Sequence, residues 1–241
     1  MKIEGRNPVN EALEAGTTID RLAVAKDIKD AAGNRIIASA RAKGIKIQFL
    51  DRKILDRESL TGNHQGFIAS TTEFKYCEVG DILACAETRG EQPLIIILDG
   101  VEDPHNLGSV LRVAECGGAH GVIIGRHRSA SVNETVIKVS AGAAEHMRVA
   151  RVTNINDTID DFKNRGIWVM AADLGGQDIY KSDLKGALAI VVGGEGTGVK
   201  RLTREKCDAV VTLPIRGKVN SLNASVACGI TLYEALRQRN S

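Results

Sequence analysis

Short, nearly unbroken apolar runs recur along the chain after residue 93. Two of them, Leu94–Leu98 and Leu188–Val192, contain no polar side chain. This pattern is typical of strands with both faces covered, because a strand with one face in solvent alternates apolar and polar residues. Segments with the 3-4 apolar spacing of helices separate the runs. The pattern therefore predicts a mostly parallel α/β domain over residues 93–241.

The remaining elements expected in this domain follow the same two patterns. Further strands are expected over residues 121–124, 147–152, 166–172 and 209–215. Helices are expected over residues 106–116, 132–143 and 155–165, and from about residue 222 onward.

The first 76 residues show a shorter alternation of strands and helices. Ile45, Ile47 and Phe49 alternate with polar residues as in a strand, and Asn7 before Pro8 is a typical helix start. Residues 77–92 mix Gly, Glu, Asp and Pro without clear periodicity. We therefore expect a small αβ domain over residues 1–76, a linker over residues 77–92 and the larger domain after it. In the small domain, strands are expected over 21–25, 45–50 and 66–71, and helices over 7–13, 30–43 and 52–60.

Composition indicates a soluble folded protein. Of the 241 residues, 43% are hydrophobic, 26% are charged and only 3% are aromatic. This balance excludes a disordered chain and favours α/β layers over an aromatic-rich β-sandwich. The longest apolar runs are strand-sized, so neither a membrane span nor a membrane partner is expected. The net charge of +2 neither demonstrates nor excludes binding to nucleic acid.

The N-terminus and the cysteines bear on the cellular compartment. Residues 1–5 mix charges and lack the apolar stretch of a secretory signal. The five cysteines include no Cys-x-x-Cys pair, which argues against a disulfide framework or a zinc site. We therefore expect a cytoplasmic protein with reduced thiols and no bound metal.

The segment 106–112, directly after the first strand of the larger domain, is the first with candidate chemistry. Its apolar residues have the spacing of a buried helix stripe, and Arg112 falls roughly opposite that stripe. The neighbouring Gly108 and Ser109 are small and would let a phosphate group or another backbone approach closely. The alternative is an ordinary solvated arginine, and the residues alone leave both interpretations open.

A glycine-rich loop, residues 193–198, follows the second apolar run. It has four glycines in six residues, but it lacks the Lys-Ser/Thr ending of a Walker A loop, and Glu195 would repel a triphosphate. It also does not fit the Gly-x-Gly-x-x-Gly pattern of dinucleotide-binding folds. A tight turn around an uncharged or cationic ligand fits better, with a purely structural turn as the alternative.

The third segment runs from Leu213 to Ser225. A strand ends at Pro214, and Ser221 or Asn223 can cap the final helix. One cap accounts for one of the polar residues Asn220, Ser221 and Asn223, and not for all three. All three segments follow the carboxyl end of a strand, where open α/β sheets bind ligands, so together they predict an active site.

These three segments closely resemble motifs 1, 2 and 3 of the SpoU/TrmH branch of the SPOUT methyltransferases. The matching residues, in order, are Asn106-x-Gly108-x-x-x-Arg112, Gly194-Glu195-Gly196 with Gly198, and Leu213-Pro214-Ile215 with Ser221-Leu222-Asn223-Ala224-Ser225. The N-terminal part resembles that branch's substrate-binding domain, which is similar to the ribosomal protein L30e fold. Its matching residues are Gly5-Arg6-Asn7-Pro8-Val9 and Asn63-His64-Gln65-Gly66.

The resemblance implies a fold, a cofactor and an assembly. The fold would be an L30e-like domain followed by a SPOUT domain whose C-terminal segment threads into a deep trefoil knot. The knot's loops would hold S-adenosylmethionine, and two subunits would complete the site, which implies a homodimer with residues 222–238 as its interface. No metal is implied.

The resemblance also implies roles for individual residues. Arg112 is the family's catalytic arginine, and Asn106, Glu195 and Asn223 would organise the reaction around it. The cofactor pocket would be lined by Gly193, Gly194, Leu213, Ile215, Leu222 and Ser221. Candidate RNA contacts in the N-terminal domain are Arg6, His64 and Gln65.

The activity implied is methylation of a ribose 2′-hydroxyl in RNA, most like that of bacterial enzymes acting on a guanosine of 23S ribosomal RNA. Alternatives within the family are transfer RNA and other ribosomal positions, including resistance-type methylation. A non-catalytic RNA-binding protein is the alternative of another class. A Rossmann-type methyltransferase or dehydrogenase would need a glycine-rich loop after an early strand, which Leu98-Asp99-Gly100-Val101-Glu102 does not supply.

Arg112 has two conceivable roles in such a reaction. A free guanidinium has a pKa above about 12 and is a poor general base at neutral pH. We therefore prefer the hypothesis that Arg112 grips a phosphate of the target nucleotide and polarises its hydroxyl, and keep general-base catalysis as the alternative.

Overall fold

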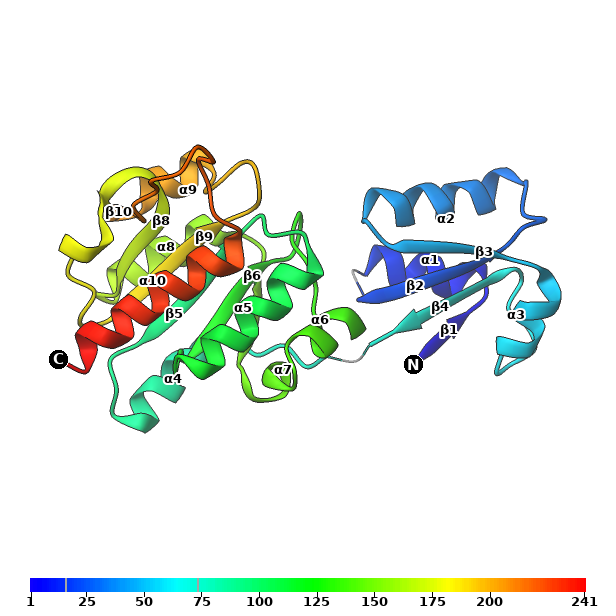
Figure 1. The fold of residues 1–241 in the computed structure, drawn as a ribbon. Helices are drawn as coiled ribbons and strands as arrows, with labels where there is room; N and C mark the ends of the chain where they lie inside the picture. The colour runs from blue at the N-terminus through cyan, green and yellow to red at the C-terminus, as the bar shows by residue number, and fades with distance from the viewer. Residues whose placement is uncertain (16, 73) are drawn as a thin grey trace. The chain divides into compact units, whose positions relative to one another are not determined.

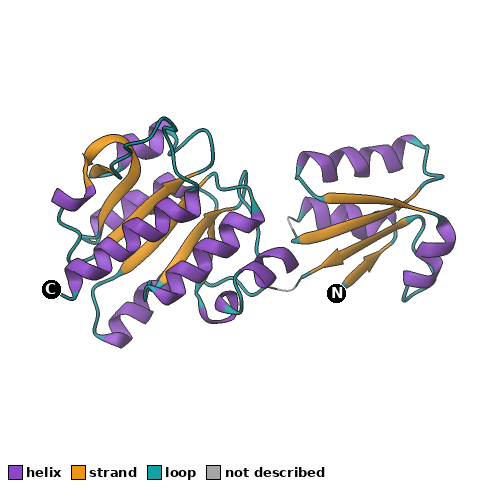
Figure 2. Cartoon of the chain, in the orientation of Figure 1, coloured by secondary structure: helices purple, strands orange, loops and turns teal. Residues whose placement is uncertain are grey.

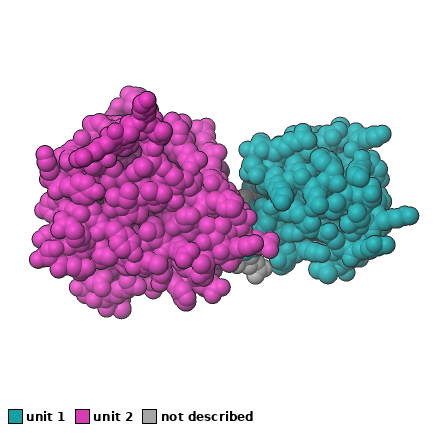
Figure 3. All heavy atoms as spheres, viewed as in Figure 1, with its two compact units in different colours: residues 1–74 teal, residues 75–241 magenta. Residues whose placement is uncertain are grey.

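The computed structural model of the protein describes residues 1–15, 17–72 and 74–241. The chain folds into two compact units, Met1–Phe74 and Lys75–Ser241 (Figure 3). Each unit has its own β-sheet with helices packed on it (Figure 2).

The first unit is a four-stranded sheet between two layers of helices. Its strand order is β1-β4-β2-β3, with β2 and β3 parallel and the other pairs antiparallel. Helices α1 and α2 bury their apolar residues with Leu22, Val24 and Phe67, whereas Leu55 of α3 packs with Ala23 and Ile68, which alternate with them along the strands. The elements are β1 (Lys2–Glu4), α1 (Arg6–Glu14), β2 (Ile19–Ala25), α2 (Ala31–Ala42), β3 (Lys46–Leu50), α3 (Arg52–Glu58) and β4 (Phe67–Thr71).

Strand β1 has no counterpart among the predicted elements, because three residues are too few to show a period. Its last residue, Glu4, holds the loop after α3. The Glu4 carboxylate accepts hydrogen bonds from the backbone N–H of Leu60 and Thr61 and from the hydroxyls of Ser59 and Thr61. Burial raises the pKa of Glu4, but these hydrogen bonds outweigh it and lower the pKa from 4.5 to about 2.

The second unit is built on a six-stranded sheet in the order β10-β8-β9-β5-β6-β7, in which neighbouring strands are parallel. This confirms the predicted α/β class. The elements are α4 (Val79–Arg89), β5 (Leu94–Asp99), α5 (Pro104–Cys116), β6 (Gly121–Gly125), α6 (Glu134–Val139), α7 (Ala143–His146), β7 (Val149–Val152), α8 (Ile155–Asn164), β8 (Trp168–Asp178), η1 (Ile179–Lys181), β9 (Leu188–Gly193), α9 (Arg201–Lys206), β10 (Ala209–Thr212) and α10 (Ala224–Arg239).

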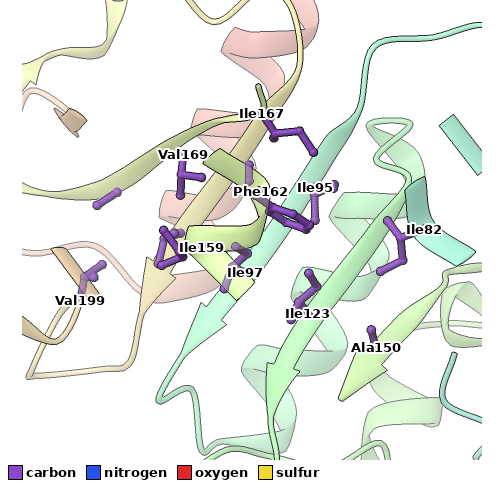
Figure 4. Packing of buried hydrophobic residues seen from close by; sticks show 13 residues of the cluster. Ile82, Ile95, Ile97, Ile123, Ala150, Ile159, Phe162, Ile167, Val169 and Val199 are labelled. Carbon is purple, nitrogen blue, oxygen red and sulfur yellow. The ribbon is translucent and has the colours of Figure 1, made fainter. Parts of the chain in front are cut away.

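Both faces of this sheet are covered, as the unbroken apolar runs predict. On one face, Phe162 and Ile159 of α8 and Ile82 of α4 pack against alternate strand residues such as Ile95 and Ile97 (Figure 4). Helices α5 and α10 lie side by side over the opposite face (Figure 1). The complete burial of β5 and β9 explains why the runs Leu94–Leu98 and Leu188–Val192 contain no polar position.

In the second unit, the structure departs from the predicted elements at several places. The segment expected as a linker, 77–92, contains α4, and its Ile82 is fully buried in the second unit. Its periodicity is weak because the helix buries only a narrow stripe. The helix expected over 132–143 is interrupted by Ala141 and Gly142, whose φ angles are +51° and +91°. Helix α5 begins two residues before Asn106, with Asp103 as its cap. The trefoil knot stays a prediction.

Across the part of the chain that the structure describes, no helix is long and apolar enough to cross a membrane.

We predict that Glu4 stabilises the first unit only while it is ionised. Its pKa is depressed in the folded protein, so its contribution is complete above about pH 4.5 and disappears as the pH falls toward 2. Glu4→Gln should therefore lower the melting temperature at pH 6 and have much less effect at pH 2.5, measured by circular dichroism. Glu11→Gln, an exposed carboxylate of α1, is the control. An equal loss for Glu4→Gln at both pH values would contradict the assignment.

Candidate active site

A cavity of about 520 Å³ opens at the carboxyl ends of β9 and β10 and beside the middle of β8. It is bounded by the glycine-rich loop 193–198 and by the segment 213–224 that leads into α10. Its size is that of a small-molecule site. All of the residues predicted for the cofactor pocket line it, namely Gly193, Gly194, Leu213, Ile215, Ser221 and Leu222.

Three predicted residues from distant segments form one hydrogen-bonded cluster at the edge of this cavity. The Asn106 Nδ2 donates to Glu195 Oε1 at 2.9 Å, and the Asn223 Nδ2 donates both to the same oxygen and to Asn106 Oδ1 at 2.8 Å. Glu195 and Asn223 line the cavity, and Asn106 is buried in the first turn of α5. We call this group the Asn106–Glu195–Asn223 cluster.

The cap of α10 fixes the orientation of Asn223 in this cluster. Its Oδ1 accepts hydrogen bonds from the backbone N–H of Ser225 and Val226 and from the Ser225 hydroxyl. Because the oxygen is committed to the helix start, the amide nitrogen must face Glu195. Of the two caps that the sequence allowed for this helix, Ser221 and Asn223, the structure therefore shows Asn223.

Two glycines of the loop lie where one backbone segment crosses directly over another, which leaves no room for a side chain. A Cβ added at Gly193 would lie 2.0 Å from the carbonyl carbon of Gly198, and one at Gly194 would lie 2.2 Å from the carbonyl oxygen of Gly100. No side chain fits at either position. Gly193 and Gly194 thus allow two backbone segments to pack directly against each other, and they also line the cavity.

An ion pair between a buried carboxylate, Asp99, and the half-exposed Lys200 closes this loop, and it was not expected from the sequence. Asp99 at the end of β5 is only 2% exposed, and its carboxylate accepts from Lys200 Nζ at 2.6 Å and from Lys200 N at 3.0 Å. The Asp99 carbonyl also accepts from the Gly194 N–H at 3.0 Å. An acidic residue ending an otherwise apolar strand was the available signal, because a buried carboxylate needs a partner.

The cavity wall is acidic as well as apolar. Glu195 and a second carboxylate, Asp173, line it together with Leu213, Ile215 and Leu222. Arg204 lies 3.4 Å from the Asp173 carboxylate. Carboxylates around an apolar pocket favour a cationic ligand over an anionic one. Asp173 was not among the predicted residues.

Arg112 lies apart from the cluster within one chain. Its side chain is exposed on α5, does not line the cavity, and has no hydrogen-bond or ion-pair partner among the described residues. The adjacent Gly108 is packed against α6, since an added Cβ would lie 2.8 Å from Val139 Cβ. The group that approaches Gly108 is therefore the protein itself.

The predicted RNA contacts of the first unit divide into two kinds. His64 is buried: its Nδ1 accepts from the Gly66 N–H at 3.0 Å, so its Nε2 donates to Asp56 at 2.9 Å. Both ring nitrogens are engaged within the chain, so His64 holds the loop, and its contact with RNA stays a prediction. Arg6 and Gln65 lie together near the surface, with the Arg6 N–H donating to Gln65 Oε1 and its guanidinium paired with Asp30.

The SpoU rRNA Methylase family matches residues 93–233, and the domain described as RNA 2′-O ribose methyltransferase substrate binding matches residues 2–77. The chain belongs to the SpoU rRNA methylase family. A relative named RlmB, 23S rRNA (guanosine-2′-O-)-methyltransferase of Vibrio cholerae, is 47% identical over 200 residues, covering 81% of this chain and 79% of the relative. YacO of Bacillus subtilis, named as a TrmH family tRNA/rRNA methyltransferase, is 44% identical over 237 residues, covering 98% and 95%.

Solved structures of this family have the same fold. The SpoU methyltransferase AviRb of Streptomyces viridochromogenes in complex with AdoMet aligns with a TM-score of 0.63 at 23% identity, covering 99% of this chain and 90% of that one. An AdoMet-bound rRNA methyltransferase of Sinorhizobium meliloti aligns with a TM-score of 0.59 at 25% identity, covering 98% and 86%. The SpoU family member described here is accordingly an S-adenosylmethionine-dependent RNA methyltransferase.

The residues present fit this cofactor. The cavity has the volume for a nucleoside with an amino-acid tail, and its apolar residues can cover an adenine ring. The Glu195 and Asp173 carboxylates suit the positive charge of a sulfonium.

We predict that Gly194→Ala disrupts the loop. The added Cβ would meet the Gly100 backbone, which cannot move aside, so the substitution should lower stability by about 2–3 kcal/mol and the melting temperature by roughly 5–10 °C. S-Adenosylmethionine binding, measured by calorimetry, should be lost. Gly217→Ala, where the nearest atom is 4.0 Å from the added Cβ, should change neither quantity. Unaltered stability of Gly194→Ala would show that the crossing is not tight.

Proposed function

We propose that this enzyme methylates the ribose 2′-hydroxyl of a guanosine in 23S ribosomal RNA. The observation that carries the proposal is the Asn106–Glu195–Asn223 cluster, which joins three motif segments at the mouth of a cavity suited to S-adenosylmethionine. The Vibrio cholerae relative, named for this reaction, supports the ribosomal target. The name of the Bacillus subtilis relative includes transfer RNA, which is therefore the second candidate substrate.

The protein's own groups must bring the hydroxyl oxygen into line with the methyl group and its sulfur. S-Adenosylmethionine, when bound, supplies a methyl group activated by a sulfonium. Backbone groups of 193–194 and 213–215 would hold the nucleoside part, and the cluster would orient the ribose through the amides of Asn106 and Asn223. Alignment of this kind can supply up to about 7–11 kcal/mol of the rate acceleration.

Arg112 serves in this proposal as a phosphate anchor. Its guanidinium is exposed and has no acidic partner among the described residues, so it is available to an RNA phosphate. A guanidinium stays protonated at neutral pH and binds phosphate through paired N–H groups. It would hold the target nucleotide and polarise the hydroxyl, while the proton leaves to phosphate or water.

A second copy of the chain completes the site in the proposal. Val226, Ile230 and Tyr233 form a stripe along α10 that is 37–48% exposed, and Leu222 extends it toward the cavity. Helix α5 packs tightly beside α10, since a Cβ at Gly117 would lie 2.7 Å from Leu232. A partner bound to this stripe would therefore meet the side of α5 as well, which gives Arg112 a route to the partner's cavity.

The RNA target can be tested with separated RNA pools. We expect the purified enzyme to transfer label from S-adenosylmethionine to a single ribose of 23S ribosomal RNA and not to transfer RNA. Glu195→Ala, which removes the acceptor shared by Asn106 and Asn223, is expected to reduce transfer at least tenfold and serves as the control. Labelling of transfer RNA alone would favour the second candidate, and labelling of neither pool would refute both.

Sharing of the site between subunits can be tested by mixing variants. Arg112→Ala and Glu195→Ala should each be inactive, but a heterodimer would contain one intact site if Arg112 acts in the partner's cavity. Co-refolded in equal amounts, the two variants should recover about a quarter of wild-type activity. Full activity of Arg112→Ala at saturating RNA would remove Arg112 from the reaction, and no recovery on mixing would place each Arg112 in its own chain's site.

A further inference from the structure

The loop after β6 carries three consecutive cationic or titratable side chains, Arg126, His127 and Arg128, which we call the 126–128 loop. All three are exposed. Neither Arg126 nor Arg128 has an ion-pair partner among the described residues, unlike the exposed Arg165, which pairs with Asp161, and Arg201, which pairs with Glu205. Two nearby guanidinium groups without an acidic partner raise the local positive potential and attract anions.

Backbone hydrogen bonds hold this loop at the ligand-binding edge of the sheet. The Arg126 N–H donates to the Val152 carbonyl at the end of β7, and the Arg151 guanidinium donates to the Arg126 carbonyl at 3.3 Å. On its other side, the Ala130 N–H donates to the Val101 carbonyl at 2.8 Å. Val101 lies in the connection between β5 and α5 that leads to Asn106. Hydrogen bonds on both sides of the loop thus anchor it beside the start of α5.

The sheet order places the loop on a defined side of the site. The cavity lies at the ends of β9 and β10 and beside the middle of β8, and the Asn106–Glu195–Asn223 cluster lies between β9 and the start of α5. The 126–128 loop follows β6, which lies beyond β5 in the sheet (Figure 1). The loop does not line the cavity. An RNA strand whose target ribose lies at the cluster can therefore extend across the end of β5 onto the 126–128 loop.

We propose that Arg126 and Arg128 bind backbone phosphates of the substrate RNA, on the side of the target nucleotide away from the cofactor. This inference rests on the proposed function, because it takes RNA as the substrate. The contacts would be to phosphate, so they would add affinity and orientation and would not select a base. The φ angle of Arg128 is +52°, a conformation that glycine adopts more readily than arginine.

The test compares Arg126→Ala/Arg128→Ala with Arg89→Ala/Lys185→Ala in the full-length enzyme. Arg89 and Lys185 are exposed and precede β5 and β9, so they lie at the amino ends of the strands, away from the site. The control therefore removes the same number of positive charges elsewhere on the unit. For the loop variant we expect about tenfold or greater weakening of 23S RNA binding at 0.1 M salt. The slope of log affinity against log salt should fall by about 1.4–1.8, the value for two lost phosphate contacts.

Three further readouts separate the outcomes. The loop variant should bind S-adenosylmethionine with unchanged affinity and keep its turnover rate at saturating RNA, and Arg126→Lys/Arg128→Lys should keep the salt slope. Equal RNA affinity and slope in the loop variant and the control, in an enzyme whose wild type methylates ribosomal RNA, would overturn the inference and leave the proposed function intact. Weakened cofactor binding would also overturn it, because the loop would then act on the cavity. A wild-type enzyme that methylates no RNA would refute the proposed function instead.

Discussion

Backbone segments from two distant parts of the second unit, residues 99–100 and 193–200, meet at one point beside the cavity, and the site depends on that contact. The carbonyl of Gly100 faces the Cα of Gly194, and the turn closes with Gly193 against Gly198. The Asp99–Lys200 ion pair locks the same point, because Asp99 is buried and Lys200 supplies both a side-chain and a backbone donor. Since a buried carboxylate without its partner is costly, the ends of β5 and β9 keep a fixed separation.

That fixed separation allows short side chains to build the cluster. Glu195 lies one residue beyond the crossing, and Asn106 lies in the first turn of the helix that follows Gly100. Asn223 joins them from a position 117 residues away from Asn106, held by the helix start that it caps. The two asparagine side chains are short, so the backbone positions set much of the geometry of the cluster.

Charge is divided across the carboxyl edge of the sheet in a way that matches the two ligands of the reaction. The cavity side carries Glu195 and Asp173, which suit a cationic cofactor. The guanidinium groups of Arg112, Arg126 and Arg128, which have no ion-pair partner in the part of the chain that the structure describes, lie outside the cavity, where an anionic RNA strand can reach them. A protein with a net charge of only +2 can thus bind RNA, because the distribution of its charges counts for more than their sum.

The sequence by itself determined the α/β class, most elements and the three segments of the site, because buried parallel strands and helix caps leave local signals in residue type and spacing. Only the tertiary structure decided that Ile82 makes the expected linker part of the core, that His64 is interior, and that Asp99 pairs with Lys200. It also decided that Arg112 stands apart from the cluster within one chain. Burial and pairing depend on segments far apart in the chain, and local periodicity carries no information about which of them meet.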